Sequence, residues 1–210
     1  MDERIAEIRR RQAEVALKKL KDHNFGTSYF ETGAQALESL RELIPAGASI
    51  GVGGSETLRE LGVIDWLTGN EHYRFLDRYH TDDSDRIMHE SLNADVYLMS
   101  ANAVTLDGML YNVDGNGNRV AALIYGPRKV YVLAGTNKLV PDLEAAIARV
   151  KQIAAPANNV RLKKDNPCTM LGSCMNCSRD TTICNQYVAT RRSGIRERIH
   201  VILINEELGY

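Results

Sequence analysis

Hydrophobic and polar positions along this 210-residue chain change repeatedly between the spacing of a helix and that of a strand. The first block, residues 1–24, predicts an N-terminal helix over residues 2–24, because a few apolar side chains recur at near-helical spacing among Arg, Lys and Glu. These apolar side chains are Ile5, Ile8, Val15 and Leu20.

Strands and helices are expected to alternate over the next part of the chain. The predicted strands cover residues 27–31, 48–53, 73–79, 94–105 and 129–135. The predicted helices cover residues 34–44, 53–62, 83–93 and 141–154, and residues 119–125 fit either a short helix or a strand. This alternation predicts an α/β core over residues 25–156, with a mostly parallel sheet flanked by helices and right-handed crossovers.

Turn-forming residues interrupt this alternation at two places. Residues 108–118 predict a hairpin, because Asp-Gly and Asn-Gly pairs supply the positive φ values that tight turns need. These pairs are Asp114-Gly115 and Asn116-Gly117. Pro156 is expected to end the regular part of the core.

The C-terminal part of the chain combines a polar segment with a final apolar one. Residues 195–207 are apolar enough to predict a strand that returns to the sheet. The cysteine-rich residues 165–186 then form an insertion between two core elements, and the whole chain, 1–210, forms a single domain.

Composition and charge exclude several classes of protein. Hydrophobic residues make up 44% and charged residues 25%, and 26 Lys and Arg nearly balance 27 Asp and Glu, so we expect no nucleic-acid partner. No apolar run reaches the length of a membrane span, and the N-terminus is charged where a signal peptide is apolar. We therefore expect a cytoplasmic protein without a membrane partner, and a homo-oligomer is compatible with the sequence.

All four cysteines lie in one polar stretch, at Cys168, Cys174, Cys177 and Cys184. In a reducing compartment, clustered cysteines indicate metal binding or redox chemistry more than disulfides. The C-x2-C pair suits two thiolates that bind one ion or cluster, and four thiolates complete either a zinc site or a [4Fe–4S] cluster. Four unliganded cysteines, or a redox-active pair, are the plainer alternatives.

A glycine-rich loop, "GVGGSETL", follows one predicted strand and opens a helix, an arrangement that favours an anion. Glu56 replaces the last glycine of a dinucleotide-binding fingerprint and no phosphate-binding Lys follows, so classical NAD or ATP binding is not expected. The plainer interpretation is a tight turn in which Ser55 or Thr57 caps the helix, with Glu60 completing a capping box.

Polar residues also follow two other predicted strands, in "SANAVTLDG" and "LAGTNK". Ligands of open α/β sheets bind at the carboxyl ends of the strands, so these loops, the glycine loop and the 108–118 segment are expected to share a crevice. Arg119 and Lys138 suit an anionic ligand best. The predicted ligand residues are Gly53, Gly54, Ser55, Thr105, Asp107, Arg119, Thr136, Asn137 and Lys138.

Three segments together resemble the LUD (lactate-utilisation) domain family, specifically its short stand-alone members with a C-terminal cysteine segment. They are "GVGGSETLRELG", "ANAVTLDGMLYNVDGNGNRVAALIYGPRKVYVLAGTNKLV" and "PCTMLGSCMNCSRDTTIC". The resemblance covers about residues 5–207 and implies a fold like that of the NagB/RpiA/CoA-transferase group. It also implies a role in the cytoplasmic oxidation of L-lactate, alongside iron–sulfur partner subunits. The ferredoxin-like C-x2-C-x2-C-x3-C run of the larger members is absent here.

Three functions remain open from the sequence. The first is an accessory or electron-transfer component of L-lactate or related organic-acid oxidation, with a small anionic ligand and a metal centre held by the four cysteines. The second is a transferase or isomerase that acts on a phosphate, carboxylate or CoA compound, with structural zinc and Glu56 or Asp107 as the reactive carboxylate. The third is a non-catalytic subunit whose basic N-terminal helix binds a partner.

Overall fold

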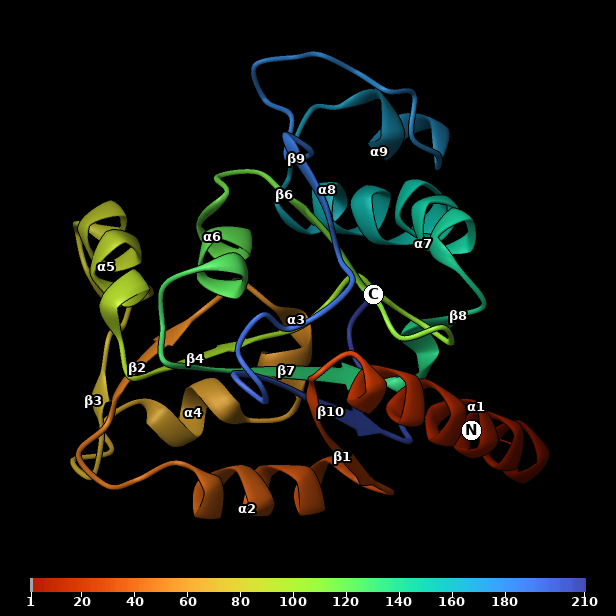
Figure 1. Cartoon of the computed structure of the whole chain (residues 1–210). Coiled ribbons are helices and arrows are strands. Elements are labelled where there is room, and N and C mark those ends of the chain that lie inside the picture. Colours follow the sequence, from red (N-terminus) through yellow and green to blue (C-terminus); the bar gives the residue numbers. More distant parts are fainter. Residues whose placement is uncertain (1) are drawn as a thin grey trace.

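A six-stranded parallel sheet forms the centre of the computed structural model, which describes residues 2–210 (Figure 1). Every pair of neighbouring strands runs parallel. In spatial order the strands are β1 (Gly26–Phe30), β10 (Ile199–Ile204), β7 (Lys129–Gly135), β4 (Val96–Met99), β2 (Ser49–Val52) and β3 (Arg74–Phe75). The predicted α/β class is confirmed, and the returning C-terminal strand pairs between β1 and β7.

Helices cover both faces of this sheet, as expected where parallel strands are joined by crossovers (Figure 1). One face packs against α2 (Gly33–Leu43), α3 (Glu56–Glu60) and α4 (Val63–Leu67). The other packs against α1 (Glu3–Asp22) and α6 (Asn118–Ile124). A short helix, α5 (Ser84–Glu90), and a 3-10 turn, Ser91–Asn93, lead into β4. None of the helices in residues 2–210 is long and apolar enough to cross a bilayer.

The buried face of α1 consists mainly of small side chains. Leu20 is buried, but Ile5, Ile8 and Val15 are about half exposed. The fully buried side chains on this helix are Ala13, Ala16 and Leu20. Small alanine side chains let the helix axis approach the sheet closely, and the predicted N-terminal helix is confirmed.

The predicted strand 94–105 is divided between two sheets. β4 ends at Met99, and the chain leaves the parallel sheet through Ser100–Asn102 before forming β5 (Ala103–Thr105). A second, four-stranded sheet contains β8 (Leu139–Val140), β5, β6 (Leu110–Asp114) and β9 (Gln186–Thr190) in that order. Both halves are buried and apolar, and only Ser100 and Asn102 mark the break in the sequence.

The Asp-Gly and Asn-Gly pairs do not form the predicted hairpin. They connect β6 to α6, and Gly117 adopts φ +83° immediately before the helix. The hairpin lies one strand earlier, between antiparallel β5 and β6, where Gly108 has φ +87°. Positive-φ residues therefore mark both turns, but the type of element that follows each turn depends on tertiary pairing.

The helix after β8 continues past Pro156, contrary to expectation. α7 (Leu143–Arg149) runs through a π-helical stretch, Val150–Ala154, into α8 (Ala155–Arg161). Pro156 lies just after the π-helical stretch, where the regular hydrogen-bond pattern of an α-helix is already interrupted. A last helix, α9 (Pro167–Leu171), begins the cysteine segment, which leads into β9.

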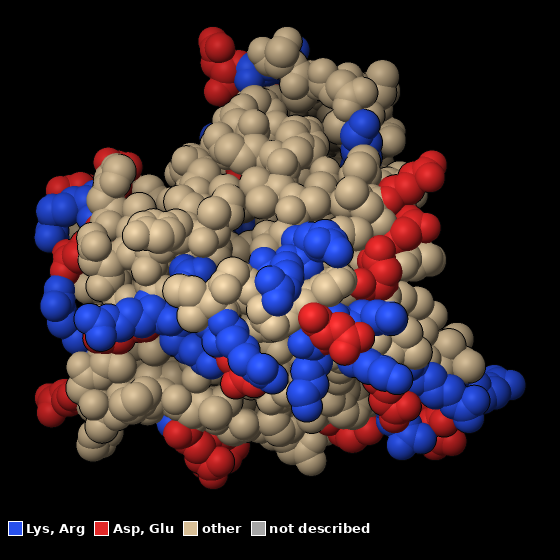
Figure 2. All heavy atoms as spheres, in the orientation of Figure 1, with Lys and Arg blue, Asp and Glu red and all other residues tan. Residues whose placement is uncertain are grey.

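Basic side chains gather across the middle of one face of the molecule (Figure 2). Figure 1 places α1 and the segment between β9 and β10 on this side. That segment contributes the exposed Arg191, Arg192 and Arg196. The near-neutral total charge of the chain therefore hides an uneven distribution.

Candidate functional site

A cleft of about 520 Å³ opens at the carboxyl ends of three strands of the parallel sheet. Residues 54–57 follow β2, residues 100–102 follow β4, and Lys138 follows β7. The opposite wall comes from α8 and the cysteine segment. The charged residues that line the cleft are Glu56, Arg78, Asp114, Arg119, Lys138, Arg161, Lys164 and Asp180.

The glycine loop closes the cleft beside α3. Ser55 caps this helix, its Oγ accepting a hydrogen bond from the Leu58 N–H at 3.3 Å. The Thr57–Glu60 capping box does not form, since Glu60 accepts from the N–H of Gly209 instead. Gly53 has a packing role, because a Cβ there would lie 2.8 Å from Cγ of Arg119.

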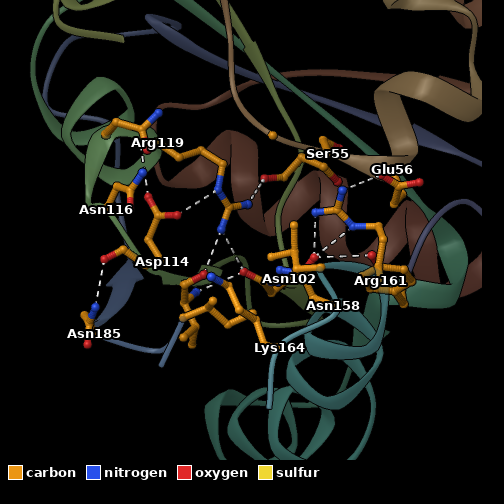
Figure 3. Close-up of a pocket in the computed structure, with 18 of the residues that line it drawn as sticks. Ser55, Glu56, Asn102, Asp114, Asn116, Arg119, Asn158, Arg161, Lys164 and Asn185 are labelled. Carbon is orange, nitrogen blue, oxygen red and sulfur yellow. Dashed lines mark hydrogen bonds and ion pairs between the residues drawn. The ribbon is translucent and has the colours of Figure 1, made fainter. Parts of the chain in front are cut away.

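Arg119 is buried beside Gly53 and is fixed by several acceptors (Figure 3). Its Nε donates to Asp114 at 3.4 Å, and its terminal nitrogens donate to the carbonyl groups of Ser100 and Val113 and to Oδ1 of Asn102. The Asp114 carboxylate also accepts from the Arg119 backbone N–H. Arg119 thus joins α6, the β4–β5 connection and β6, and lines the cleft.

Lys138 lies at the inner end of the site, with only 3% of the residue exposed. Its Nζ donates to Oγ1 of Thr57 at 2.8 Å and to Oγ of Ser100 at 3.1 Å. Burial, together with the positive charges of Arg149 and Arg119, lowers the pKa of Lys138 to about 7. No carboxylate in residues 2–210 lies within ion-pair distance of it.

The charges of the cleft leave an excess of cations. Two of the acids are paired, Asp114 with Arg119 and Glu56 with Arg161, whose Nη1 lies 3.1 Å from Oε1 of Glu56 (Figure 3). Within residues 2–210, three cleft cations form no ion pair: Arg78, Lys138 and Lys164. Among the cleft acids of the same residues, only Asp180 forms no ion pair. The cleft therefore favours a negatively charged ligand.

Five of the predicted ligand residues do not line this cleft. Gly53 packs on Arg119, and Thr136 donates to Oδ1 of Asn205. Thr105 and Asp107 hydrogen-bond each other in the turn between β5 and β6. Gly54, Ser55, Arg119 and Lys138 do line it.

Asn137 is the fifth predicted ligand residue that lies outside the cleft lining. It holds the C-terminal segment instead. Its Oδ1 accepts from the Leu208 N–H at 3.2 Å, and its Nδ2 donates to the Gly209 carbonyl at 3.1 Å. Thr57 also donates to the carbonyl of Leu208. The next residue, Tyr210, thereby reaches the cleft, where its hydroxyl donates to Oδ1 of Asn158.

Sequence reasoning missed the part of the cleft that comes from α8 and its neighbours. Asn158, Arg161 and Lys164 were overlooked because Pro156 was expected to end the core. Arg149 was overlooked as well. It is buried, its Nη1 donates to the Asn102 carbonyl at 2.7 Å, and burial lowers its pKa to about 10.

The four cysteines lie in one lobe beside the cleft. Cys168 is buried and the other three are partly exposed. Burial, together with the charges of Cys174, Cys168 and Cys177, raises the pKa of Cys184 to about 11. No group of three His, Cys, Asp or Glu side chains in residues 2–210 is arranged to hold a metal ion. The donor set itself is of the kind that zinc and iron–sulfur clusters take, and the metal centre stays a prediction.

The cysteine segment also forms one wall of the cleft. The residues between Cys177 and Asn185 supply Asp180, Thr181, Thr182 and Ile183 to its lining. Asn166 fixes this wall to α8, donating to Oδ1 of Asn159 and to the Thr181 carbonyl. The sulfur-bearing segment and the anion-attracting cleft are therefore one structural unit.

Comparison with known proteins agrees with this architecture. The fold is similar to that of a DUF162 family protein from Deinococcus radiodurans, with a TM-score of 0.55 and 15% identity, over 93% of this chain and 98% of that one. At this identity the similarity concerns the fold alone. No curated protein matches the chain significantly. The LUD domain, in contrast, matches residues 13–204, nearly the whole length, and the chain therefore belongs to the LUD domain family.

Proposed function

We propose that this LUD-domain protein is a cytoplasmic component of the oxidation of L-lactate or a related organic acid. It binds the small organic anion in the cleft and holds a [4Fe–4S] cluster or zinc at Cys168, Cys174, Cys177 and Cys184. The observation that carries the proposal is the cleft itself, in which three cations have no carboxylate partner within residues 2–210.

Two further features support this ligand class. The cleft contains amide and hydroxyl groups suited to the oxygens of a hydroxy acid, including Asn116, Asn118 and Asn158. Its volume of about 520 Å³ accommodates a small metabolite. Membership of the LUD domain family is a separate support, because the resemblance to that family implies lactate utilisation.

The cysteines give the protein its electron-transfer role in this proposal. A cluster held there would relay electrons between a substrate-oxidising iron–sulfur partner and an acceptor. The chain would set the potential of the cluster through burial and through hydrogen bonds to sulfur, such as the one from the Asn176 N–H to Sγ of Cys174 at 3.4 Å.

Anaerobic purification followed by iron, sulfide and zinc analysis tests the metal part. We expect stoichiometric iron and sulfide with visible absorbance, both lost in the C174S/C177S double variant. A colourless protein with one zinc ion per chain would contradict electron transfer and leave a structural metal. A calorimetric screen with L-lactate, sugar phosphates and CoA esters tests the ligand class.

The second candidate function is a transferase or isomerase that acts on a phosphate, carboxylate or CoA compound. It is favoured by Glu56, a carboxylate that lines the cleft with its side chain 24% exposed. Asp107, the other carboxylate considered for this role, lies at the β5–β6 turn, outside the cleft lining. Turnover of a CoA ester or sugar phosphate that E56Q abolishes, in a zinc-containing protein, would favour this function over lactate oxidation.

A further inference from the structure

Lys138 is held in an unusual way for a buried cation. A fully buried lysine ordinarily has a carboxylate partner, because a charged amine loses its hydration on burial. The only polar side-chain groups of residues 2–210 that bond to Nζ of Lys138 are the hydroxyls of Thr57 and Ser100. These hydroxyls supply no negative charge.

The hydrogens of both hydroxyls are already used. Oγ1 of Thr57 donates to the Leu208 carbonyl at 3.2 Å, and Oγ of Ser100 donates to the Ala101 carbonyl at 3.3 Å. Each hydroxyl oxygen therefore accepts from Nζ, whether the amine is neutral or charged. Two of the three positions on Nζ carry N–H donors in both states. The third position carries either a proton or a lone pair.

The charged groups around Nζ oppose its protonation. The positive charges of Arg149 of α7 and Arg119 of α6 oppose a further positive charge, and Glu60 of α3 favours it only weakly. Burial acts in the same direction as the two arginines, and together they bring the pKa to about 7. A bound anion reverses this balance, because it adds negative charge to the cleft that Lys138 lines.

We propose that the cleft takes up its anion together with one proton, which Lys138 receives on the third position of Nζ. The new N–H then donates to the anion, while the bonds to Thr57 and Ser100 persist. No other bond breaks, and the proton comes from the solvent. This inference rests on the proposed function in so far as the ligand is a small anion.

The rest of the cleft makes the effect of this proton measurable. Its lining within residues 2–210 includes no histidine and no cysteine. The other charged residues of the lining are Glu56, Asp114, Asp180, Arg78, Arg119, Arg161 and Lys164. The lining also contains the Tyr210 hydroxyl, whose pKa burial raises above its usual 10. The proton uptake is therefore assigned to Lys138, the cleft group whose pKa is about 7.

Isothermal titration calorimetry with L-lactate and with sulfate tests the proposal, because neither anion changes charge between about pH 6 and pH 9. We expect the affinity to fall by about tenfold for each pH unit well above the point at which Lys138 deprotonates. Near pH 8, titrations in buffers of different ionisation enthalpy should show the uptake of close to one proton per anion bound.

Three variants separate proton uptake by Lys138 from the general effect of positive charge in the cleft. K138R, which stays charged, should bind without the pH dependence, and K138M should bind weakly at every pH with no proton uptake. K164M, the control, removes an exposed cleft cation, and should weaken binding while keeping both the pH dependence and the proton uptake.

The outcomes distinguish the two proposals. If either probe binds to the unaltered protein with constant affinity over this range and exchanges no proton, the inference about Lys138 is wrong while the anion cleft stands. If neither probe binds at any pH, the proposed function falls and this inference falls with it. Measurements on the unaltered protein suffice for both, even if K138M or K138R fails to fold.

Discussion

Single atoms decide the geometry of the cleft at the glycine loop. Gly53 and Gly54 are neighbours in the sequence and look equivalent there, but only Gly53 faces a buried side chain, Arg119. Because Gly53 has no Cβ, it leaves room for the aliphatic part of the Arg119 side chain. A methyl group on Gly54, in contrast, would have nothing within 4 Å, so its neighbourhood is open.

We predict that G53A destabilises the protein and G54A does not. A Cβ at position 53 would meet Cγ and Cδ of Arg119 at 2.8 and 2.9 Å, and forcing that buried side chain aside should cost about 1–3 kcal/mol of unfolding free energy. Urea denaturation measures the difference. Equal midpoints for the two variants would contradict the close packing of Gly53 on Arg119.

Asn137 is a second position at which the role of a residue depends on its surroundings. Its side-chain amide bonds Leu208 and Gly209 on both sides and lies outside the cleft lining. We predict that N137A releases residues 206–210, with a loss of about 1–3 kcal/mol. Hydrogen exchange should show faster exchange of the Leu208 and Gly209 amides. Unchanged protection there would indicate that other contacts suffice.

Strand pairing, at the scale of elements, places an ionisable residue inside the sheet. His200 of β10 lies opposite Gly26 of β1, where a Cβ would come within 2.5 Å of the imidazole ring, and its Nε2 is 2.8 Å from Oγ of Ser28. Burial, assisted by Lys129, lowers the pKa of His200 from 6.5 to about 4. The folded protein therefore holds this side chain neutral.

We predict that stability falls as the pH falls from about 6.5 towards 4. In this range the unfolded chain binds a proton at His200 that the folded chain does not, so the contribution is complete above the unfolded pKa and is lost on acidification. Urea midpoints between pH 7.5 and pH 5 should decline less steeply in H200Q. The control H89Q alters a histidine whose side chain is 76% exposed. An identical decline in H200Q and the unaltered protein would exclude His200 as a cause.

Segments far apart in the sequence build the site at the scale of the whole molecule. The second sheet, α8 and the cysteine segment form a lobe on one side of the parallel sheet (Figure 1). The lobe supplies one wall of the cleft, and the strand ends of the parallel sheet supply the other. A metal at the cysteines would therefore stiffen the wall at residues 180–185.

We predict that loss of the metal proposed for the cysteines weakens anion binding about tenfold, or ~1.4 kcal/mol, without unfolding the parallel sheet. The cysteine segment lies outside the two hydrophobic clusters that flank that sheet, so the sheet should persist. Calorimetry with L-lactate before and after chelation, and on C177S, measures the change, with far-UV circular dichroism as the control. Metal loss that leaves the affinity unchanged would separate the two sites.

Local signals in the sequence determined the class of fold and part of the cleft. Hydrophobic periodicity and positive-φ residues report on the nearest neighbours along the chain, and they were sufficient for the strand–helix alternation, for the parallel sheet and for loops with Gly54, Ser55, Arg119 and Lys138. The cysteine spacing likewise predicts a metal from local chemistry alone.

Only the tertiary structure decided how these parts meet. It divided residues 94–105 between two sheets, carried the helix past Pro156 and gave Asn137 to the C-terminal segment. It also placed Lys138 between two hydroxyls and two arginines from other elements. The physical reason is that burial, hydrogen-bond partners and nearby charges depend on residues distant in the chain, to which local periodicity is insensitive.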